Sequence, residues 1–220
     1  MSQLGFVVNP ATCVYTMHSF DDIRRQLAQR PARILEEPGP ARSAVALILG
    51  QRAEGLGILF IKRAPRPGDP WSGDLAFPGG RLEPCDSGPQ AAAERETWEE
   101  LGLDLQQALN LGRLDDIAGA HLPVVVSGFV YGIGLPVGLT LSEEVEQAFW
   151  TPLTTLRDPR RHGPAVVHFN GSALTRPAID LLGPGHKVLW GITYRLVMGF
   201  FERLGWSVDP RPSAYPDGKD

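Results

Sequence analysis

The sequence contains only two cysteines, Cys13 and Cys85, among 220 residues. Two isolated cysteines provide neither the closely spaced pairs of a zinc motif nor the framework of a disulfide-rich secreted domain. The N-terminus also lacks the basic stretch and apolar core that are typical of a signal peptide. These absences favour a reduced setting, and we expect a cytoplasmic protein.

Basic residues are in the minority, with 21 lysines and arginines against 25 aspartates and glutamates and a formal net charge of −4. Nucleic-acid binding that relies on a strong overall positive field is therefore not expected. Hydrophobic residues make up 43% of the chain, an ordinary globular value. A chain of this length and composition can bury a core of its own.

Long uninterrupted hydrophobic runs are absent as well. The most membrane-like segment lies between Asp116 and Glu143, where no side chain is formally charged. Pro123, Pro136 and several glycines interrupt it, whereas a membrane-spanning helix needs about 20 mainly apolar residues. The segment instead indicates two strands with a turn between them, so we expect no membrane association.

What the sequence does contain is a mixture of short strand-like and helix-like segments. This mixture indicates an α/β or α+β domain layered around one sheet. We expect the domain to occupy 43–206, after a tail and short helix over 1–42 and before a flexible tail over 207–220; Met17 is a candidate native start. Strands are expected over 43–49, 57–62, 75–77, 111–117, 124–131 and 165–169, and helices over 20–30, 143–148 and 188–204.

A further helix is expected shortly after the segment Phe77-Pro78-Gly79-Gly80. Ser87 and Gln90 have the spacing of a capping box, and Pro89 suits the first turn of a helix. Gly102 is a suitable C-terminal stop. The expected helix therefore spans most of the region between Ser87 and Gly102.

This helix carries Glu94, Glu96, Glu99 and Glu100 within two turns. Like charges at neighbouring helical positions repel by a few tenths of a kcal/mol per pair. Glu96, Glu99 and Glu100 are spaced three and four apart and share one face, and hard divalent cations such as Mg²⁺ prefer oxygen ligands. Arg95 can pair with one of the carboxylates and orient it. Taken alone, the helix also fits a solvated, charged surface.

Together with its surroundings, the helix resembles the Nudix box, the signature of the Nudix hydrolase family. The family pattern is Gly, five residues, Glu, seven residues, Arg-Glu, an apolar residue, any residue, Glu-Glu, any residue, Gly and an apolar residue. The matching residues here are Gly80, Arg95, Glu96, Glu99, Glu100, Gly102 and Leu103.

The box departs from the general pattern in four places. The spacing from Gly80 to Arg95 is one residue longer, and Asp86 stands where the first Glu is usual. Both features are similar to the coenzyme A diphosphatase branch of the family. Thr97 occupies the apolar position, and Glu94 stands where that branch often has an apolar residue. The last two departures concern local packing and remove no expected metal ligand.

The resemblance implies a Nudix-type α/β/α sandwich with a mixed central sheet. It also implies Mg²⁺- or Mn²⁺-dependent hydrolysis of a diphosphate by metal-activated water attack on phosphorus. The metal is expected at Glu96, Glu99 and Glu100, close to the backbone of Gly80, with Arg95 as a supporting catalytic residue.

The general base stays open between the box and a downstream acidic segment. Glu99 is either a third metal ligand or the residue that acts on the attacking water. The downstream candidates are Glu143, Glu144 and Glu146, of which we favour Glu144. The alternative for this segment is a solvated first turn of a helix.

Substrate contacts are expected upstream of the box, where RAPRPGDPWSGDLAFPGG partly resembles the coenzyme A branch. Arg63 can bind phosphate, Trp71 can stack on a nucleobase, and the backbone of Gly79 can approach phosphates closely. Asp69 and Asp74 stand where that branch usually has Arg and Gln. We interpret them as acids in substrate-facing positions, which weakens the assignment to coenzyme A.

The sequence therefore predicts a hydrolase of a small-molecule diphosphate, with coenzyme A or its thioesters as the first choice. One alternative is a Nudix hydrolase of another nucleoside diphosphate derivative, such as ADP-ribose, a dinucleotide or an oxidised nucleoside triphosphate. Another is a non-catalytic, Nudix-like nucleotide-binding module. Many members of the family dimerise, so a homodimer is left open.

Overall fold

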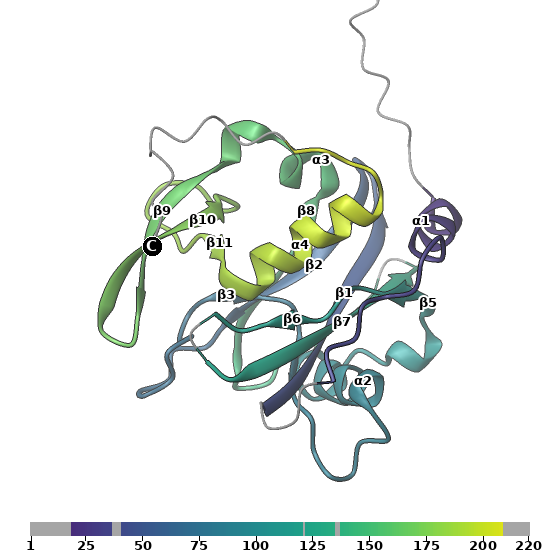
Figure 1. Cartoon of the computed structure of the whole chain (residues 1–220), viewed down its shortest axis with the longest axis horizontal. Helices are drawn as coiled ribbons and strands as arrows, with labels where there is room; N and C mark the ends of the chain where they lie inside the picture. The colour runs from purple at the N-terminus through teal and green to yellow at the C-terminus, as the bar shows by residue number, and fades with distance from the viewer. Residues whose placement is uncertain (1–18, 37–40, 121, 135–136, 209–220) are drawn as a thin grey trace, which may run out of the picture.

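The central feature of the computed structural model, which describes residues 19–36, 41–120, 122–134 and 137–208, is a mixed eight-stranded sheet (Figure 1). Strand β1 (Ala41–Arg52) pairs antiparallel with β2 (Gly55–Arg63) and parallel with β7 (Val124–Ile133). The remaining strands of this sheet are β3 (Leu75–Ala76), β4 (Gly79–Arg81), β5 (Leu109–Arg113), β6 (Ile117–Ala118) and β8 (Val145–Pro152).

Helices cover both faces of this sheet. The helix α2 (Pro89–Leu101) packs on one face, and α1 (Phe20–Leu27) and α4 (Gly191–Arg203) pack on the other (Figure 1). Successive side chains of a strand point to opposite faces, so β1 contributes alternate residues to two separate cores. The expected α/β/α sandwich with a mixed sheet is thus the observed architecture.

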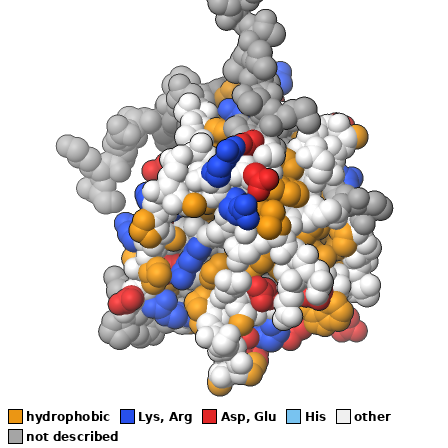
Figure 2. Space-filling model, turned by 90° about the vertical axis from the view of Figure 1, so that its right-hand side faces the viewer, with side chains coloured by type: hydrophobic (Ala, Val, Ile, Leu, Met, Phe, Trp, Pro, Cys, Tyr) orange, Lys and Arg blue, Asp and Glu red, His pale blue; other side chains and the backbone are white. Residues whose placement is uncertain are grey.

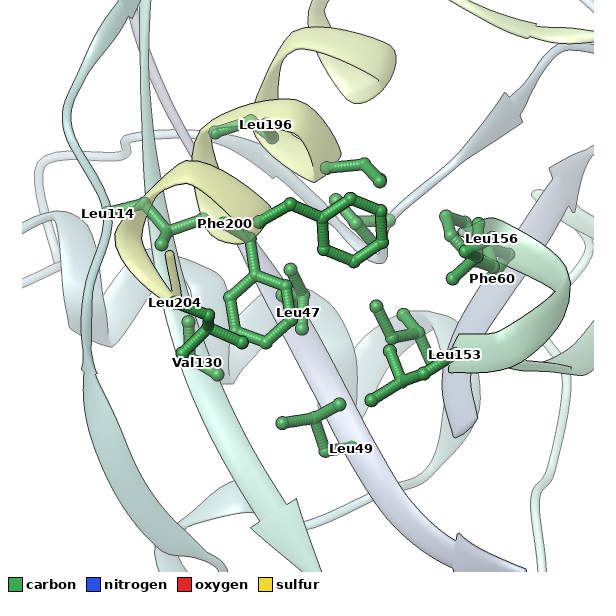
Figure 3. Close-up of a cluster of buried hydrophobic side chains, with 14 of the residues drawn as sticks. Leu47, Leu49, Phe60, Leu114, Val130, Leu153, Leu156, Leu196, Phe200 and Leu204 are labelled. Carbon is green, nitrogen blue, oxygen red and sulfur yellow. The ribbon is translucent and has the colours of Figure 1, made fainter. Parts of the chain in front are cut away.

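The larger core lies between the sheet and α4 (Figure 3). Phe200 from α4 is fully buried, together with Leu47 from β1 and Val130 from β7. The short helix α3 (Leu153–Leu156) closes the same core with two leucines. Deleting a buried aromatic ring of this kind costs about 3–5 kcal/mol, so α4 is an integral part of the domain.

The last helix also holds the first one in place. The guanidinium of Arg203 donates to the backbone carbonyls of Leu27 and Arg30 and to the carboxylate of Asp115. Leu27 is the last residue of α1, where carbonyl groups have no partner within the helix. Arg203 supplies these partners from the other end of the chain.

A second, three-stranded antiparallel sheet lies next to the large one. It consists of β9 (His162–Phe169), β10 (Ser172–Ile179) and β11 (Leu189–Trp190), in the order β11-β10-β9. The short 3₁₀ helices η1 (Leu105–Gln107) and η2 (Pro159–Arg161) complete the described elements. Strand β11 lies beside β3 (Figure 1), so the two sheets meet near the segment that precedes β4.

Most of the expected elements are confirmed, and three predictions are wrong. The turn expected between two strands within 124–131 does not form, because β7 continues without interruption from Val124 to Ile133. Residues 145–148 of the helix expected over 143–148 belong to β8, which pairs with β2 through Phe149 and Trp150. The open edge of β2 and the strand preference of aromatic residues explain this outcome. The Ser87–Gln90 capping box is also wrong, because Gly88 precedes the helix and makes no side-chain cap. The expected start at Met17 falls outside the described residues.

The surface carries charges of both signs. Figure 2 shows basic, acidic and hydrophobic side chains next to one another on the face that carries α1 and β5. Among the described residues, no helix has the length and apolar character needed to span a bilayer.

Candidate active site

The glycine pair before the acidic helix forms a short strand beneath it. Gly79 pairs with Val45 of β1, and Gly80 pairs with Ala44. Gly79 has a φ of 145°, and a Cβ at this position would lie 2.3 Å from the carbonyl oxygen of Ala44. Only glycine combines this backbone conformation with such a close approach. The sequence Gly-Gly therefore allows β4 to lie directly between β1 and α2.

The helix α2 presents two different faces. Ala93, Thr97 and Leu101, which are spaced four residues apart along one side of the helix, are fully buried against the sheet. The Thr97 hydroxyl donates to the carbonyl of Ala93 at 2.7 Å, which satisfies the polar group in its buried position. At the C-terminus, Gly102 adopts the left-handed conformation with a φ of 62°, as expected for a helix stop.

Glu100 is the most buried carboxylate of the site, with 3% of the residue exposed. Its Oε2 accepts a hydrogen bond from the backbone N–H of Gly79 at 2.9 Å. Burial raises the pKa of Glu100 to about 7, and the charges of Glu96 and Glu144 raise it further, against the opposing effects of Gly79 and Arg63. A cation beside Glu100 would stabilise its ionised form.

Glu96 lies over Gly80. A Cβ on residue 80 would come within 2.3 Å of the Glu96 carboxylate, so the absent side chain is what makes room for it. Burial raises the pKa of Glu96, although Arg95 lowers it. Two carboxylates with raised pKa values thus lie against the glycine strand.

The guanidinium of Arg95 donates hydrogen bonds to acidic side chains and to a backbone carbonyl beside the helix. Its Nε and Nη2 donate to the two oxygens of Asp86 at 3.0 and 3.1 Å, and Nη2 also donates to the carbonyl of Arg81 at 3.1 Å. Its Nη1 donates to Glu96 at 3.1 Å and to Glu99 at 2.9 Å. The Asp86 hydrogen bond raises the pKa of Arg95 and lowers that of Asp86. Asp86 therefore fixes the guanidinium that holds the two glutamates.

Glu94 points to a different part of the molecule. Its carboxylate accepts hydrogen bonds from the hydroxyl of Tyr131 at 2.8 Å and from the side chain of Gln90 at 2.9 Å. Tyr131 is buried in β7, and burial together with the Glu94 hydrogen bond raises the pKa of its hydroxyl. The unusual acid in this position of the box is thus the partner of a buried tyrosine.

The three downstream acids, Glu143, Glu144 and Glu146, lie in three different surroundings. Ser142 donates from its backbone to the carbonyl of Glu100 at 3.0 Å, which brings the following residues to the end of α2. Glu144 lies near the site, since its charge raises the pKa of Glu96 and of Glu100. Glu146 pairs with Lys62 on β2 at 2.6 Å, and Glu143 is exposed.

Arg63, the last residue of β2, and Arg66, in the loop that follows, face this acidic group. Arg66 donates to Glu144 at 3.1 Å. Arg63 pairs with Asp69 at 3.0 Å, and its charge lowers the pKa of Glu100. Arg66 was not anticipated from the sequence, and the run of prolines and charges around it contains no signal for this contact.

The interpretation that Asp74 faces the substrate is wrong. Asp74 is 6% exposed, and its carboxylate accepts hydrogen bonds from Lys187 at 2.9 Å and from the indole of Trp190 at 3.1 Å. The acid is buried because it has two donors from the C-terminal part of the chain. Asp69 likewise binds protein groups, namely Arg63 and the backbone N–H of Trp71.

Carboxylates are the type of ligand that divalent cations bind, but those of the described residues are not arranged around a common ion position. Within the described part of the chain, no three acidic, histidine or cysteine side chains surround a common point at ligand distance. Arg95 holds Glu96 and Glu99, so a cation would draw Glu99 away from this contact. Three features suit Mg²⁺ or Mn²⁺: the burial of Glu100, the space over Gly80 that the Glu96 carboxylate occupies, and a set of ligands made of oxygen atoms alone.

Comparison with known proteins assigns residues 39–169 to a NUDIX domain. The chain is 31% identical over 173 residues to the mitochondrial coenzyme A diphosphatase NUDT8 of Homo sapiens, covering 77% of this chain and 71% of that protein. It is also 31% identical over 176 residues to the Mus musculus protein of the same name, covering 77% and 80% of the two chains.

A solved structure supports the fold independently. The MutT/nudix family protein from Enterococcus faecalis superposes with a TM-score of 0.54 and 18% sequence identity. The alignment covers 86% of this chain and 70% of that protein, so it includes most of the elements described above.

Proposed function

Because the chain belongs to the Nudix hydrolase family, whose members act on diphosphate bonds, we propose that it hydrolyses the diphosphate of coenzyme A or its thioesters. The observation that carries the proposal is the pair of carboxylates, Glu96 and Glu100, held against the strand Gly79-Gly80. The similarity to two proteins named coenzyme A diphosphatases, at 31% identity, supports the choice of substrate.

Nudix hydrolases generally need a divalent ion, and we place Mg²⁺ or Mn²⁺ at Glu96, Glu99 and Glu100, beside the backbone of Gly80. The chemistry that such an ion supplies is neutralisation of diphosphate oxygens and activation of water. The protein's own contribution is mainly positioning and charge stabilisation. Arg95, anchored by Asp86, keeps two of these carboxylates oriented.

Two residues compete for the role of general base. Glu99 is about half exposed and pairs with Arg95, whereas Glu144 is similarly exposed and pairs with Arg66. We favour Glu144, because Arg66 can leave this exposed pair to meet a phosphate and free the carboxylate to accept a proton. Glu144→Gln is expected to lower kcat by about 100-fold or more. A negligible effect, together with a large one for Glu99→Gln, would assign the role to Glu99.

The substrate is expected to meet Arg63, Trp71 and the Gly79 backbone. Arg63 already lies near Glu100, as its effect on the pKa of that carboxylate indicates. A diphosphate can therefore bridge the carboxylate site and this guanidinium. The exposed face of Trp71 is available for a planar group.

A second candidate function is hydrolysis of another nucleoside diphosphate derivative. It is favoured by Asp69 and Asp74, which occupy the Arg and Gln positions of the coenzyme A branch and bind protein groups instead of substrate. The metal site and the reaction would be the same in this case. Only the group attached to the diphosphate would differ.

Product analysis with Mg²⁺ tests the proposal. The panel comprises coenzyme A, acetyl-coenzyme A, ADP-ribose, NADH, a diadenosine polyphosphate and 8-oxo-dGTP. Cleavage of coenzyme A to 3′,5′-ADP and phosphopantetheine, well above the other compounds, is the expected result, and Glu100→Gln should remove it while the protein stays folded. Preferential cleavage of another compound would favour the second candidate, and unchanged turnover in Glu100→Gln would overturn the metal site.

We also propose a cytoplasmic location, on the basis of the two isolated cysteines. The two relatives from Homo sapiens and Mus musculus carry mitochondrial names, so the location needs its own test. Fractionation of cells that produce the untagged protein is expected to recover it with cytoplasmic markers. Recovery with an organelle fraction would contradict this proposal and leave the enzymatic one intact.

A further inference from the structure

Three aromatic side chains from separate parts of the chain meet beside the loop that precedes β3. Trp71 of the loop lies 6.0 Å from Phe169 at the end of β9, and Phe169 lies 6.1 Å from Trp190 of β11, measured between ring centroids. Phe169 is buried, whereas 36% of Trp71 is exposed. The cluster therefore supports Trp71 from behind and leaves part of its surface open to solvent.

The cluster is held to the loop by the buried carboxylate of Asp74. One oxygen accepts from Lys187 at 2.9 Å and the other from the indole of Trp190 at 3.1 Å. The backbone N–H of Asp74 also donates to the carbonyl of Trp71 at 3.0 Å. A single residue thus joins the turn that carries Trp71 to the segment that enters α4.

The same turn reaches the catalytic carboxylates through Asp69. Its Oδ1 accepts from the backbone N–H of Trp71 at 3.0 Å, and its Oδ2 accepts from Arg63 at 3.0 Å. The charge of Arg63 in turn lowers the pKa of Glu100. A substrate whose diphosphate meets Arg63 would therefore lie next to the turn that carries Trp71.

Part of this arrangement lies beyond the residues that match the NUDIX domain. The matched NUDIX residues end at Phe169, whereas Lys187 and Trp190 follow later in the chain. Function belongs to particular sites and not to the fold as a whole, so residues beyond the matched range can take part in recognition of the substrate. Lys187 and Trp190 are the candidates for such a part here.

We propose that Trp71 is the stacking surface for the nucleobase of the substrate, and that Asp74 and Lys187 are positioning residues that fix this surface. Every nucleobase has an aromatic face, and stacking on an exposed indole gives affinity without requiring base-specific hydrogen bonds. The Asp74–Lys187 pair keeps the indole oriented before substrate arrives, which lowers the cost of ordering it on binding. The inference rests on the proposed function for the presence of a nucleotide in the substrate.

Binding of AMP and of ribose 5-phosphate in the presence of Mg²⁺ tests the stacking surface. The two probes share the sugar phosphate and differ by the base, so their affinity ratio measures recognition of the base. Calorimetry is expected to give AMP at least about tenfold tighter binding in the native protein, with quenching of indole fluorescence. Trp71→Ala should reduce the ratio to near one, and Trp71→Phe should retain most of it. Trp98→Ala, which removes an exposed indole from the outer side of α2, is the matched control and should leave the ratio unchanged.

The positioning role is tested at the exposed member of the ion pair. Lys187→Met should lower the ratio of the affinity for AMP to that for ribose 5-phosphate several-fold. It should also raise KM with little change in kcat, and Lys187→Arg should restore the affinity ratio and KM. A merely structural role would instead lower the melting temperature and weaken both probes equally. That result would overturn the role given to Lys187.

Equal affinity of the native protein for the two probes, or an unchanged ratio in Trp71→Ala, would overturn the stacking surface itself. These outcomes are separate from failure of the proposed function. Glu100→Gln is expected to lose turnover and to keep the preference for AMP. A native protein that prefers AMP but cleaves no compound of the panel would refute the proposed hydrolysis and support the stacking surface.

Discussion

The carboxylate of Glu96 occupies the space that a side chain on Gly80 would need. A Cβ at position 80 would lie 2.3 Å from both the carboxyl carbon and one oxygen of Glu96. These two residues are 16 positions apart in the sequence and belong to β4 and α2, respectively. The contact couples the glycine strand to the position of an expected metal ligand.

Gly80→Ala is therefore expected to displace Glu96 and to lower kcat by about 100-fold, since misplacement by about 1 Å is sufficient for such a loss. Steady-state kinetics with the preferred substrate measures this effect. Gly163→Ala is the control, because a Cβ there meets no atom within 4 Å and the residue lies on β9. Comparable losses of kcat in both variants would contradict the inference that the missing side chain at Gly80 is needed to position Glu96.

Asp86→Ala should lower kcat by about 10- to 100-fold, because removing the anchor of a group that orients expected metal ligands has effects of this size. Arg95 would keep its contacts with Glu96 and Glu99 but lose both hydrogen bonds to Asp86. The variant Asp86→Glu should retain more activity than Asp86→Ala. Asp21→Ala, on the exposed surface of α1, should behave like the native enzyme. Native kcat in Asp86→Ala would refute the anchoring role.

Tyr131→Phe should destabilise the protein by about 1 kcal/mol without changing kcat, because it deletes one hydrogen bond to Glu94 and no contact of the expected metal site. Urea unfolding measures the change in the free energy of unfolding. A loss of more than tenfold in kcat, with stability unchanged, would instead connect Glu94 to catalysis.

The stability contributed by Asp115 should depend on pH. Hydrogen bonding to Arg30 lowers the pKa of Asp115 from 3.8 to about 2, and the backbone N–H of Arg33 adds to the effect. A carboxyl group whose pKa is lower in the folded state stabilises the protein above its unfolded pKa and loses this effect as the pH falls. Asp115→Asn should therefore cost about 1–2 kcal/mol at pH 7, after allowance for partial exposure.

The difference between the native protein and Asp115→Asn should be constant above about pH 5 and should shrink between about pH 5 and 2. Urea unfolding at several pH values measures it. A difference that is the same at pH 3 and pH 7 would show that Asp115 acts through packing or neutral hydrogen bonds instead of its charge.

The parts of the fold that follow from local patterns could be predicted from the sequence. The stripe Ala93, Thr97, Leu101 and the stop at Gly102 follow from helical periodicity and the backbone freedom of glycine. Strand β8 could not be predicted in the same way. Acidic residues before Val145 suit the first turn of a helix, and the pairing with β2 that decides the outcome is not visible in the local sequence.

The candidate site likewise has features that could be predicted from the sequence and features that could not. The resemblance to the Nudix box predicts that Glu96, Glu100 and Gly80 are neighbours, and the structure places Glu96 over Gly80 and Glu100 against the adjacent Gly79. The partners of Asp74 could not be foreseen, because Lys187 lies 113 positions further along the chain. An acid in a loop normally indicates exposure, and only the tertiary arrangement supplies the donors that allow it to be buried.

The contacts of Arg203 have a consequence for the way the protein is made. The carbonyls of Leu27 and Arg30 that it binds lie 176 and 173 positions earlier in the sequence. A ribosome synthesises the entire matched domain, residues 39–169, before this arginine exists. The contacts at the end of α1 can therefore form only after α4 has been synthesised. We expect this step to be slow, because bringing such distant residues together carries a large loop-closure cost.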